Sequence, residues 1–426
     1  MTTPTEDPLA NLVAGLELPD RGTGARAARR TARGGTDEPD EPDDHVGTER
    51  GHGAPRPSRR WMAVFALCMV MALGASLALT YVGLKTVRSS RAGRIVSTVT
   101  DPTAPGFEAF VEPTPTLAVL HDVNGELASA AVLALSNGDA GGSVVVVPPA
   151  TMAGVGAKAT PLSVVYAFAT DKADATRSGL QGILGIGVTE AVVVDDARWA
   201  ELVGPVAPLT LTNPDDLDGF PAGPVSLSAT EVGPWLEARR ADESDLGRLY
   251  RQQLFWEAWA TAVGAHRSDP GVVPGEVEVG IGRFARGLGN GPARIATLPV
   301  DESTDVNGNP LFVADRTAVD ALVSDLVPFP TGDVEGARTR VRLLDGTGDP
   351  EQVIRAAPLA VSAGAEIVVA GNADRFDYTV TEIRYHDPTQ RAAADRIRDS
   401  LGTGTVIDDP RPVEAFDVTI VLGTDV

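Results

Sequence analysis

The chain has 426 residues, with 36 lysines and arginines against 58 aspartates and glutamates, and a formal net charge of −22. A surface this acidic repels the phosphate backbone of nucleic acids, which excludes them as partners. The single cysteine, Cys68, lies inside an apolar run. The rest of the chain therefore has neither a disulfide framework nor a cysteine nucleophile.

The first part of the chain has the organisation of a membrane-anchored protein. Residues 1–60 mix Gly, Pro, Arg and acidic residues without apolar periodicity, which predicts a disordered tail. Residues 61–84 form an uncharged apolar run that can cross a hydrocarbon core of about 30 Å as one helix. The run begins too far from the N-terminus for a cleaved signal peptide, so we interpret it as a signal-anchor.

This anchor predicts a single-pass protein of the cell membrane, with the lipid bilayer as its first partner. We expect the tail in the cytoplasm and the long C-terminal region outside, because long domains translocate largely regardless of charge. Residues 85–115 are expected to form a basic collar and a proline-rich stalk. The heavy use of Ala, Gly, Arg, Asp and Val, with few lysines, indicates an actinobacterial source.

Residues 116–328 alternate between strand and helix patterns. The run Ser143-Val144-Val145-Val146-Val147 is β-branched and continuous, which is typical of a buried strand. This alternation predicts an α/β sandwich. The expected strands are 116–121, 130–135, 143–147, 191–194 and 294–299, and the expected helices are 161–185, 196–203, 230–240, 245–266 and 315–326.

A second unit, residues 338–426, follows a break rich in Pro and Gly at 327–337. Its predicted order is β-α-β-β-α-β, which is that of a small split-βαβ domain. The expected strands are 340–344, 366–370, 378–385 and 417–422, and the expected helices are 350–363 and 389–401.

Several motifs carry a resemblance to known families. The second unit resembles the LytR C-terminal domain of actinobacterial envelope proteins, through "VRLLDGTG" at 341–348, "GNADRFDY" at 371–378, "IRY" at 383–385 and "DVTIVLG" at 417–423. Residues 116–328 resemble the LytR-CpsA-Psr family, through "DLGRLYRQQL" at 245–254 and "VVVP" at 145–148. The second resemblance implies a domain of the cell envelope held by one N-terminal helix.

Members of that family transfer glycopolymers from a polyprenyl-pyrophosphate carrier to peptidoglycan, using arginines and a carboxylate-bound metal. Guanidinium forks match phosphate oxygens. The resemblance therefore implies a pyrophosphate site made of Arg239, Arg248, Arg251 and Gln252, with Asp122 as a weak candidate for the metal ligand.

The chain departs from the family pattern at several other positions. Pro148-Pro149-Ala150 stands where the family has Pro-Arg-Asp, Glu237 stands where it has an arginine, and residues 127–131 contain neither Arg nor Asp. A simpler interpretation of Arg248 and Arg251 is a solvated helix start. Arg248 can also pair locally with Asp245, three residues earlier.

These departures predict a degenerate catalytic domain. We expect a non-catalytic protein without a cofactor that binds or positions peptidoglycan, a lipid-linked glycopolymer or another envelope protein. One alternative is an active transferase that uses Mg²⁺ at a site rebuilt from the remaining arginines. Another is an extracellular sensor that signals through the cytoplasmic tail.

Overall fold

The computed structural model describes residues 99–153, 160–168, 171–241, 243–275, 279–410 and 415–426. The predicted tail, anchor helix and basic collar lie outside these residues. Within the described part, no helix is both long enough and apolar enough to cross a bilayer. The anchor at 61–84 therefore stays a prediction.

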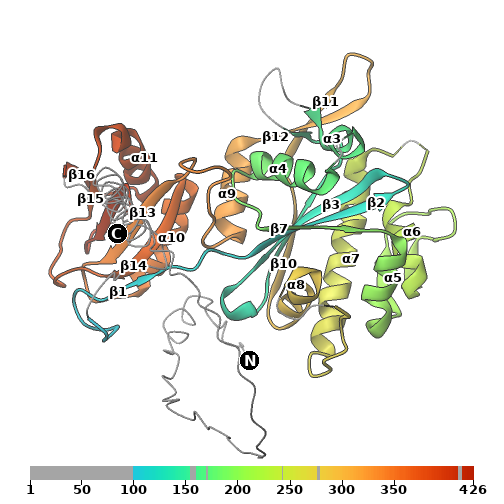
Figure 1. Cartoon of the computed structure of the whole chain (residues 1–426), viewed down its shortest axis with the longest axis horizontal. Coiled ribbons are helices and arrows are strands. Elements are labelled where there is room, and N and C mark those ends of the chain that lie inside the picture. Colours follow the sequence, from blue (N-terminus) through green and yellow to red (C-terminus); the bar gives the residue numbers. More distant parts are fainter. Residues whose placement is uncertain (1–98, 154–159, 169–170, 242, 276–278, 411–414) are drawn as a thin grey trace, which may run out of the picture. The chain divides into compact units, whose positions relative to one another are not determined.

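A five-stranded sheet forms the centre of the first domain (Figure 1). Strand β3 is antiparallel to both of its neighbours, so the other four strands all run parallel to one another. The strand order across the sheet is β10 (Ala293–Thr297), β4 (Gly142–Val147), β3 (Glu126–Leu135), β2 (Thr116–Val123) and β7 (Glu190–Val194).

Helices cover both faces of this sheet. Alternate strand residues point to opposite sides, and apolar side chains on both sides have to be buried. Val144 and Val146 pack toward one layer, whereas Val145 and Val147 pack toward the other. This arrangement confirms the predicted α/β sandwich. The first layer contains α5 (Asp196–Val203), α6 (Val232–Glu237), α7 (Asp245–Ala265) and α8 (Gly280–Gly289), and the second contains α3 (Leu162–Phe168), α4 (Lys172–Leu184) and α9 (Arg316–Leu326).

Several elements differ from the sequence expectation. The single helix expected at 161–185 is two helices, α3 and α4. The glycine-rich α8 is helical because Ile281, Phe284 and Leu288 bury its apolar face, and this burial outweighs the weak helix propensity of glycine. The sequence patterns also missed three short pairs: β5 (Met152–Ala153) with β6 (Thr160–Pro161), β8 (Leu209–Asn213) with β9 (Gly223–Leu227), and β11 (Val300–Thr304) with β12 (Pro310–Ala314).

The C-terminal domain is a six-stranded sheet whose core packs against two helices, α10 (Glu351–Ser362) and α11 (Arg391–Leu401). It contains the predicted β-α-β-β-α-β series and two further strands. One of these, β1, comes from the expected stalk. The strand order is β1 (Glu108–Phe110), β14 (Ala365–Asn372), β13 (Thr339–Asp345), β17 (Val418–Leu422), β15 (Glu382–Tyr385) and β16 (Thr405–Asp408).

Candidate functional site

The candidate site lies at the carboxyl edge of the five-stranded sheet. In parallel sheets the loops that follow the strands gather at this edge, and ligands usually bind there. Asp122 lies near the end of β2, Pro148–Ala150 follow β4, and Asp195 and Asp196 follow β7. The start of α7 reaches the same edge, because the backbone N–H of Ala150 donates to Asp245 Oδ2 over 3.1 Å.

Asp245 is the centre of the first ion-pair group. Arg239 Nη2 lies 2.5 Å and Arg248 Nη2 lies 2.6 Å from Asp245 Oδ1. The predicted local pair of Asp245 with Arg248 is therefore confirmed. Arg248 is only 5% exposed, so the alternative of a solvated arginine is wrong for this residue. Burial lowers the pKa of Arg248, and the charge of Asp245 partly offsets this effect.

Arg251 is the centre of the second group. Its guanidinium donates to both carboxylate oxygens of Glu243, over 2.6 and 2.9 Å, and to Asp215 over 2.6 Å. Arg240 reaches the same Asp215 over 3.2 Å. Arg251 is 1% exposed, so it too is not a solvated residue. Burial opposes its charge, but the two carboxylates outweigh burial and raise the pKa of Arg251.

The arginines of the site are thus engaged by the chain's own acids. Arg239, Arg240, Arg248 and Arg251 contact three carboxylates, those of Asp215, Glu243 and Asp245. The N–H forks that would match a diphosphate already hold carboxylate oxygens. The structure therefore brings Arg239 and Arg248 together at Asp245, and it places Arg251 in the neighbouring ion-pair group.

Gln252 differs from these arginines. It is 2% exposed, and among the described residues neither its amide nitrogen nor its amide oxygen finds a hydrogen-bond partner. The same holds for Arg248 Nε and for Thr151 Oγ1. Unpaired buried polar groups cost about 1–3 kcal/mol each. These atoms therefore keep hydrogen-bonding capacity for a polar ligand group.

Asp122 belongs to a different set of contacts. Its carboxylate accepts from Tyr166 Oη over 2.6 Å and from the N–H of Gly125 over 2.7 Å, and Lys172 Nζ lies 3.9 Å away. Burial raises the pKa of Asp122, but these hydrogen bonds outweigh burial and lower it overall. Burial of the Tyr166 side chain, and then its hydrogen bond to Asp122, raise the pKa of Tyr166.

Asp122 lines a cleft of about 680 Å³, and most of the charged residues in its lining are acidic. Asp195, Asp196 and Glu237 line it together with Arg198. Burial, and then repulsion by Asp196, raise the pKa of Glu237. Yet the described residues hold no group of three or more His, Cys, Asp or Glu side chains placed to bind a metal ion.

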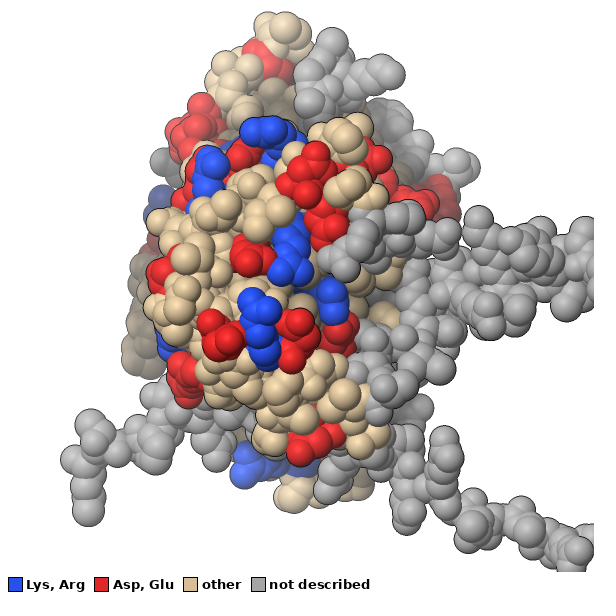
Figure 2. Space-filling model, turned by 90° about the vertical axis from the view of Figure 1, so that its left-hand side faces the viewer, with Lys and Arg blue, Asp and Glu red and all other residues tan. Residues whose placement is uncertain are grey.

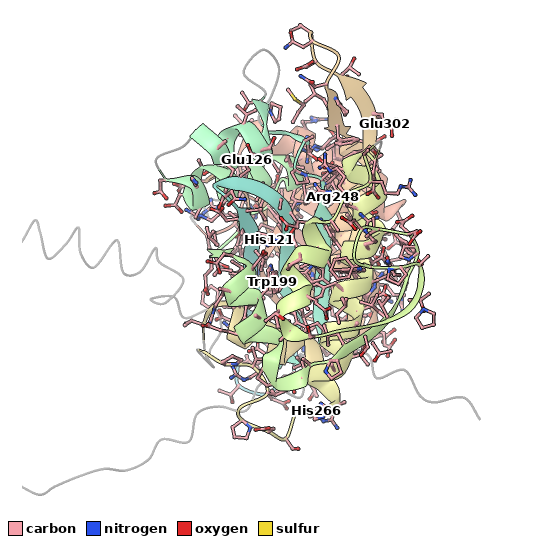
Figure 3. All side chains as sticks on the ribbon, turned by 90° about the vertical axis from the view of Figure 1, so that its right-hand side faces the viewer. His121, Glu126, Trp199, Arg248, His266 and Glu302 are labelled. Atoms are coloured by element: carbon pink, nitrogen blue, oxygen red, sulfur yellow. The ribbon has the colours of Figure 1, made fainter. Side chains whose placement is uncertain are left out.

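His121 is a site residue that sequence reasoning missed. Its ring is fully buried at the end of β2, its Nε2 lies 2.9 Å from Asp196 Oδ1, and Trp199 packs edge-on at 6.2 Å. Figure 3 shows Arg248, His121 and Trp199 along the same side of the domain. Burial lowers the pKa of His121, and Asp196 opposes this effect. Its position just before Asp122 in a predicted strand was the only signal available.

The C-terminal domain offers no concentrated basic surface on the face that Figure 2 shows, where basic and acidic side chains alternate. In the same domain, Arg398 of α11 pairs with both Asp395 and Asp399. Mixed charge of this kind keeps the local potential low, so this face has no patch that would concentrate a polyanion.

Residues 338–425 match the family described as "LytR cell envelope-related transcriptional attenuator". The C-terminal unit is therefore a LytR C-terminal domain, which connects the chain with the cell envelope and confirms the resemblance predicted from its motifs. A search of curated proteins found no match.

Solved structures that resemble the chain include proteins of the LytR-CpsA-Psr type. TagV of Bacillus subtilis is 15% identical with a TM-score of 0.40, and covers 50% of this chain and 96% of its own. "TagT bound to LI-WTA" is 16% identical with a TM-score of 0.42, and covers 55% and 93%. Lmo1026 of Listeria monocytogenes is 17% identical with a TM-score of 0.36, and covers 50% and 96%. These scores record a likeness and carry no further argument.

Proposed function

We propose that this protein is a membrane-anchored component of the bacterial cell envelope that binds glycopolymer or wall material without transferring it. Residues 61–84 anchor it as a single-pass protein, and its two outer domains, 116–328 and 338–426, lie outside the membrane. The observation that carries the proposal is the pairing of the site arginines with Asp215, Glu243 and Asp245.

The physical reason is competition for the same N–H donors. A diphosphate entering this edge would have to break the pairs of Asp245 and Glu243, and both carboxylates would then repel it. Pro148, Pro149 and Ala150 at the end of β4 supply neither a cation nor a metal ligand. A ligand without concentrated negative charge fits this edge better. Examples of such a ligand are a sugar chain, a wall peptide and a second envelope protein.

One observation favours the alternative function, an active polyprenyl-pyrophosphate-dependent phosphotransferase. Gln252 and Arg248 Nε keep unused hydrogen-bonding capacity inside the site. In that case Arg239, Arg248 and Arg251 would leave their carboxylate partners when the substrate binds, and Mg²⁺ would have to be held by acids freed in this step. The two functions differ in a single measurable product.

The deciding experiment offers the purified full chain in detergent a polyprenyl-pyrophosphate-linked sugar with Mg²⁺. Our proposal expects no release of polyprenyl phosphate above that of a protein-free sample, together with saturable binding of purified wall glycopolymer or peptidoglycan. Release that disappears in Arg248→Ala, but persists in the matched surface variant Arg355→Ala, would establish the transferase instead. Arg355 suits this control because its side chain is 53% exposed and lies in the C-terminal domain.

A further inference from the structure

The segment 102–111 begins with turns at 102–106 and continues as the strand β1, which lies along one edge of the C-terminal sheet beside β14 (Figure 1). In β1 the register pairs Glu108 with Gly371 and Phe110 with Val369. Further backbone bonds extend the contact in both directions: Gly106 donates to Ala373 and Val111 to Val368. The segment is therefore added to the sheet as an edge strand over a longer stretch than β1 alone.

Two residues of the 371–378 motif contact the backbone of this segment. A Cβ at Gly371 would lie 2.1 Å from the carbonyl oxygen of Phe107, so only glycine allows the approach. Asn372 donates its backbone N–H to the same carbonyl over 2.7 Å. Its side-chain amide donates to the carbonyls of Pro102 and Ala104, each over 2.9 Å. Both residues contact main-chain groups of the segment, so these contacts do not depend on which side chains the segment carries.

One contact depends on a side chain of the segment. The Nε of Arg342 lies 3.0 Å from the Glu108 carboxylate, and its Nη2 also bonds that group. Arg342 is oriented by the ring of Phe416, whose centroid lies 5.3 Å from the guanidinium carbon. Because the two side chains are only 27% and 10% exposed, the pair is partly shielded from water. An acidic residue at this position is therefore favoured.

We propose that the C-terminal domain is a receptor for an extended peptide, and that the chain's own segment 102–111 is its resident ligand. All the groups on the receptor side lie within the residues that match the LytR C-terminal family, whereas the segment lies outside them. Glu108 and Arg342 are 234 residues apart in sequence, so the pair joins the matched domain to a distant part of the chain. Strand addition of this kind takes its affinity from main-chain bonds and its selectivity from one or two side chains.

The test uses the full chain and a labelled synthetic peptide with the sequence of residues 100–112. Glu108→Arg places like charges together and releases the segment. Glu112→Arg is the matched control, because Glu112 is exposed in the same stretch. We expect the peptide to bind Glu108→Arg at least tenfold more tightly than it binds the natural chain or Glu112→Arg. Combining Glu108→Arg with Arg342→Glu restores the internal pair and is expected to bring peptide binding back to the natural level.

Amide hydrogen exchange at Gly106 and Asn372 reports release of the segment independently of the peptide. We expect faster exchange at both amides in Glu108→Arg only. Glu108→Ala is expected to bind the peptide with intermediate affinity, and it replaces Glu108→Arg should that variant not fold. Equal peptide binding by all variants would overturn the proposal. So would exchange-detected release without peptide binding, or the absence of both effects.

Discussion

The buried pair of Arg251 and Glu243 gives the sharpest test of the site's electrostatics. Their side chains are 2% and 3% exposed, and two hydrogen bonds join them. Replacing one member of a buried pair leaves an uncompensated charge, which costs about 3–5 kcal/mol. We therefore expect Arg251→Met to lower the free energy of unfolding by about this amount at pH 7. Adding Glu243→Gln should recover at least half of the loss, because the stranded charge is then gone.

Urea unfolding followed by tryptophan fluorescence measures this effect, since Trp199, Trp256 and Trp259 pack in the same domain. The matched control is Arg294→Met, whose ion pair with Asp325 is more than half exposed. We expect that control to cost less than about 1 kcal/mol. A loss in Arg251→Met no larger than that of the control would refute the reasoning. A double variant as unstable as Arg251→Met alone would refute it as well.

The pH dependence of the same variant supplies a second readout. Burial works against the charged form of Glu243, but the bonds from Arg251 and from the N–H of Arg240 lower its pKa overall. In the natural protein this carboxylate therefore stabilises the fold above its unfolded pKa, and the contribution is lost as the pH falls through the lowered folded value. Without Arg251, burial alone raises the pKa of Glu243. Protonation of Glu243 then removes the unpaired buried charge and so stabilises Arg251→Met. The difference in free energy of unfolding between the natural protein and Arg251→Met should therefore become smaller as the pH falls from 7 to about 4.

Three further variants test other parts of the structure. Arg338→Met removes a buried guanidinium that donates to three backbone carbonyls, and we expect thermal unfolding to show a loss of about 2–4 kcal/mol. Tyr166→Phe removes a hydrogen bond that lowers the pKa of Asp122. We expect urea titrations to show a stability loss of about 1–2 kcal/mol at pH 7, and we expect this loss to disappear below about pH 3, where Asp122 is protonated. Because burial lowers the pKa of His121, its protonation in the unfolded state destabilises the natural fold as the pH falls below about 6.5. The stability lost between pH 7 and pH 5 should therefore be smaller in His121→Asn, as measured by chemical unfolding at both pH values.

Local patterns were sufficient for much of the fold. The β-branched run at 143–147 predicted the buried strand β4, and the apolar spacing at 245–266 predicted α7 to within one residue of its end. The LytR C-terminal domain was recognisable from short motifs, because its turns require glycines and polar residues at defined places. Strand periodicity, helix periodicity and turn chemistry are properties of neighbouring residues, so the sequence carries them directly.

The electrostatic state of the site could not be obtained in this way. The sequence indicated Arg239, Arg248, Arg251 and Gln252 as candidates, but not the acids that hold the arginines. Asp215, 36 residues before Arg251, follows β8 of a hairpin that no pattern predicted. Likewise, nothing local to Glu108 points to Arg342. Whether an arginine is free for a ligand depends on which carboxylate the folded chain brings within about 3 Å, and only tertiary structure decides that distance.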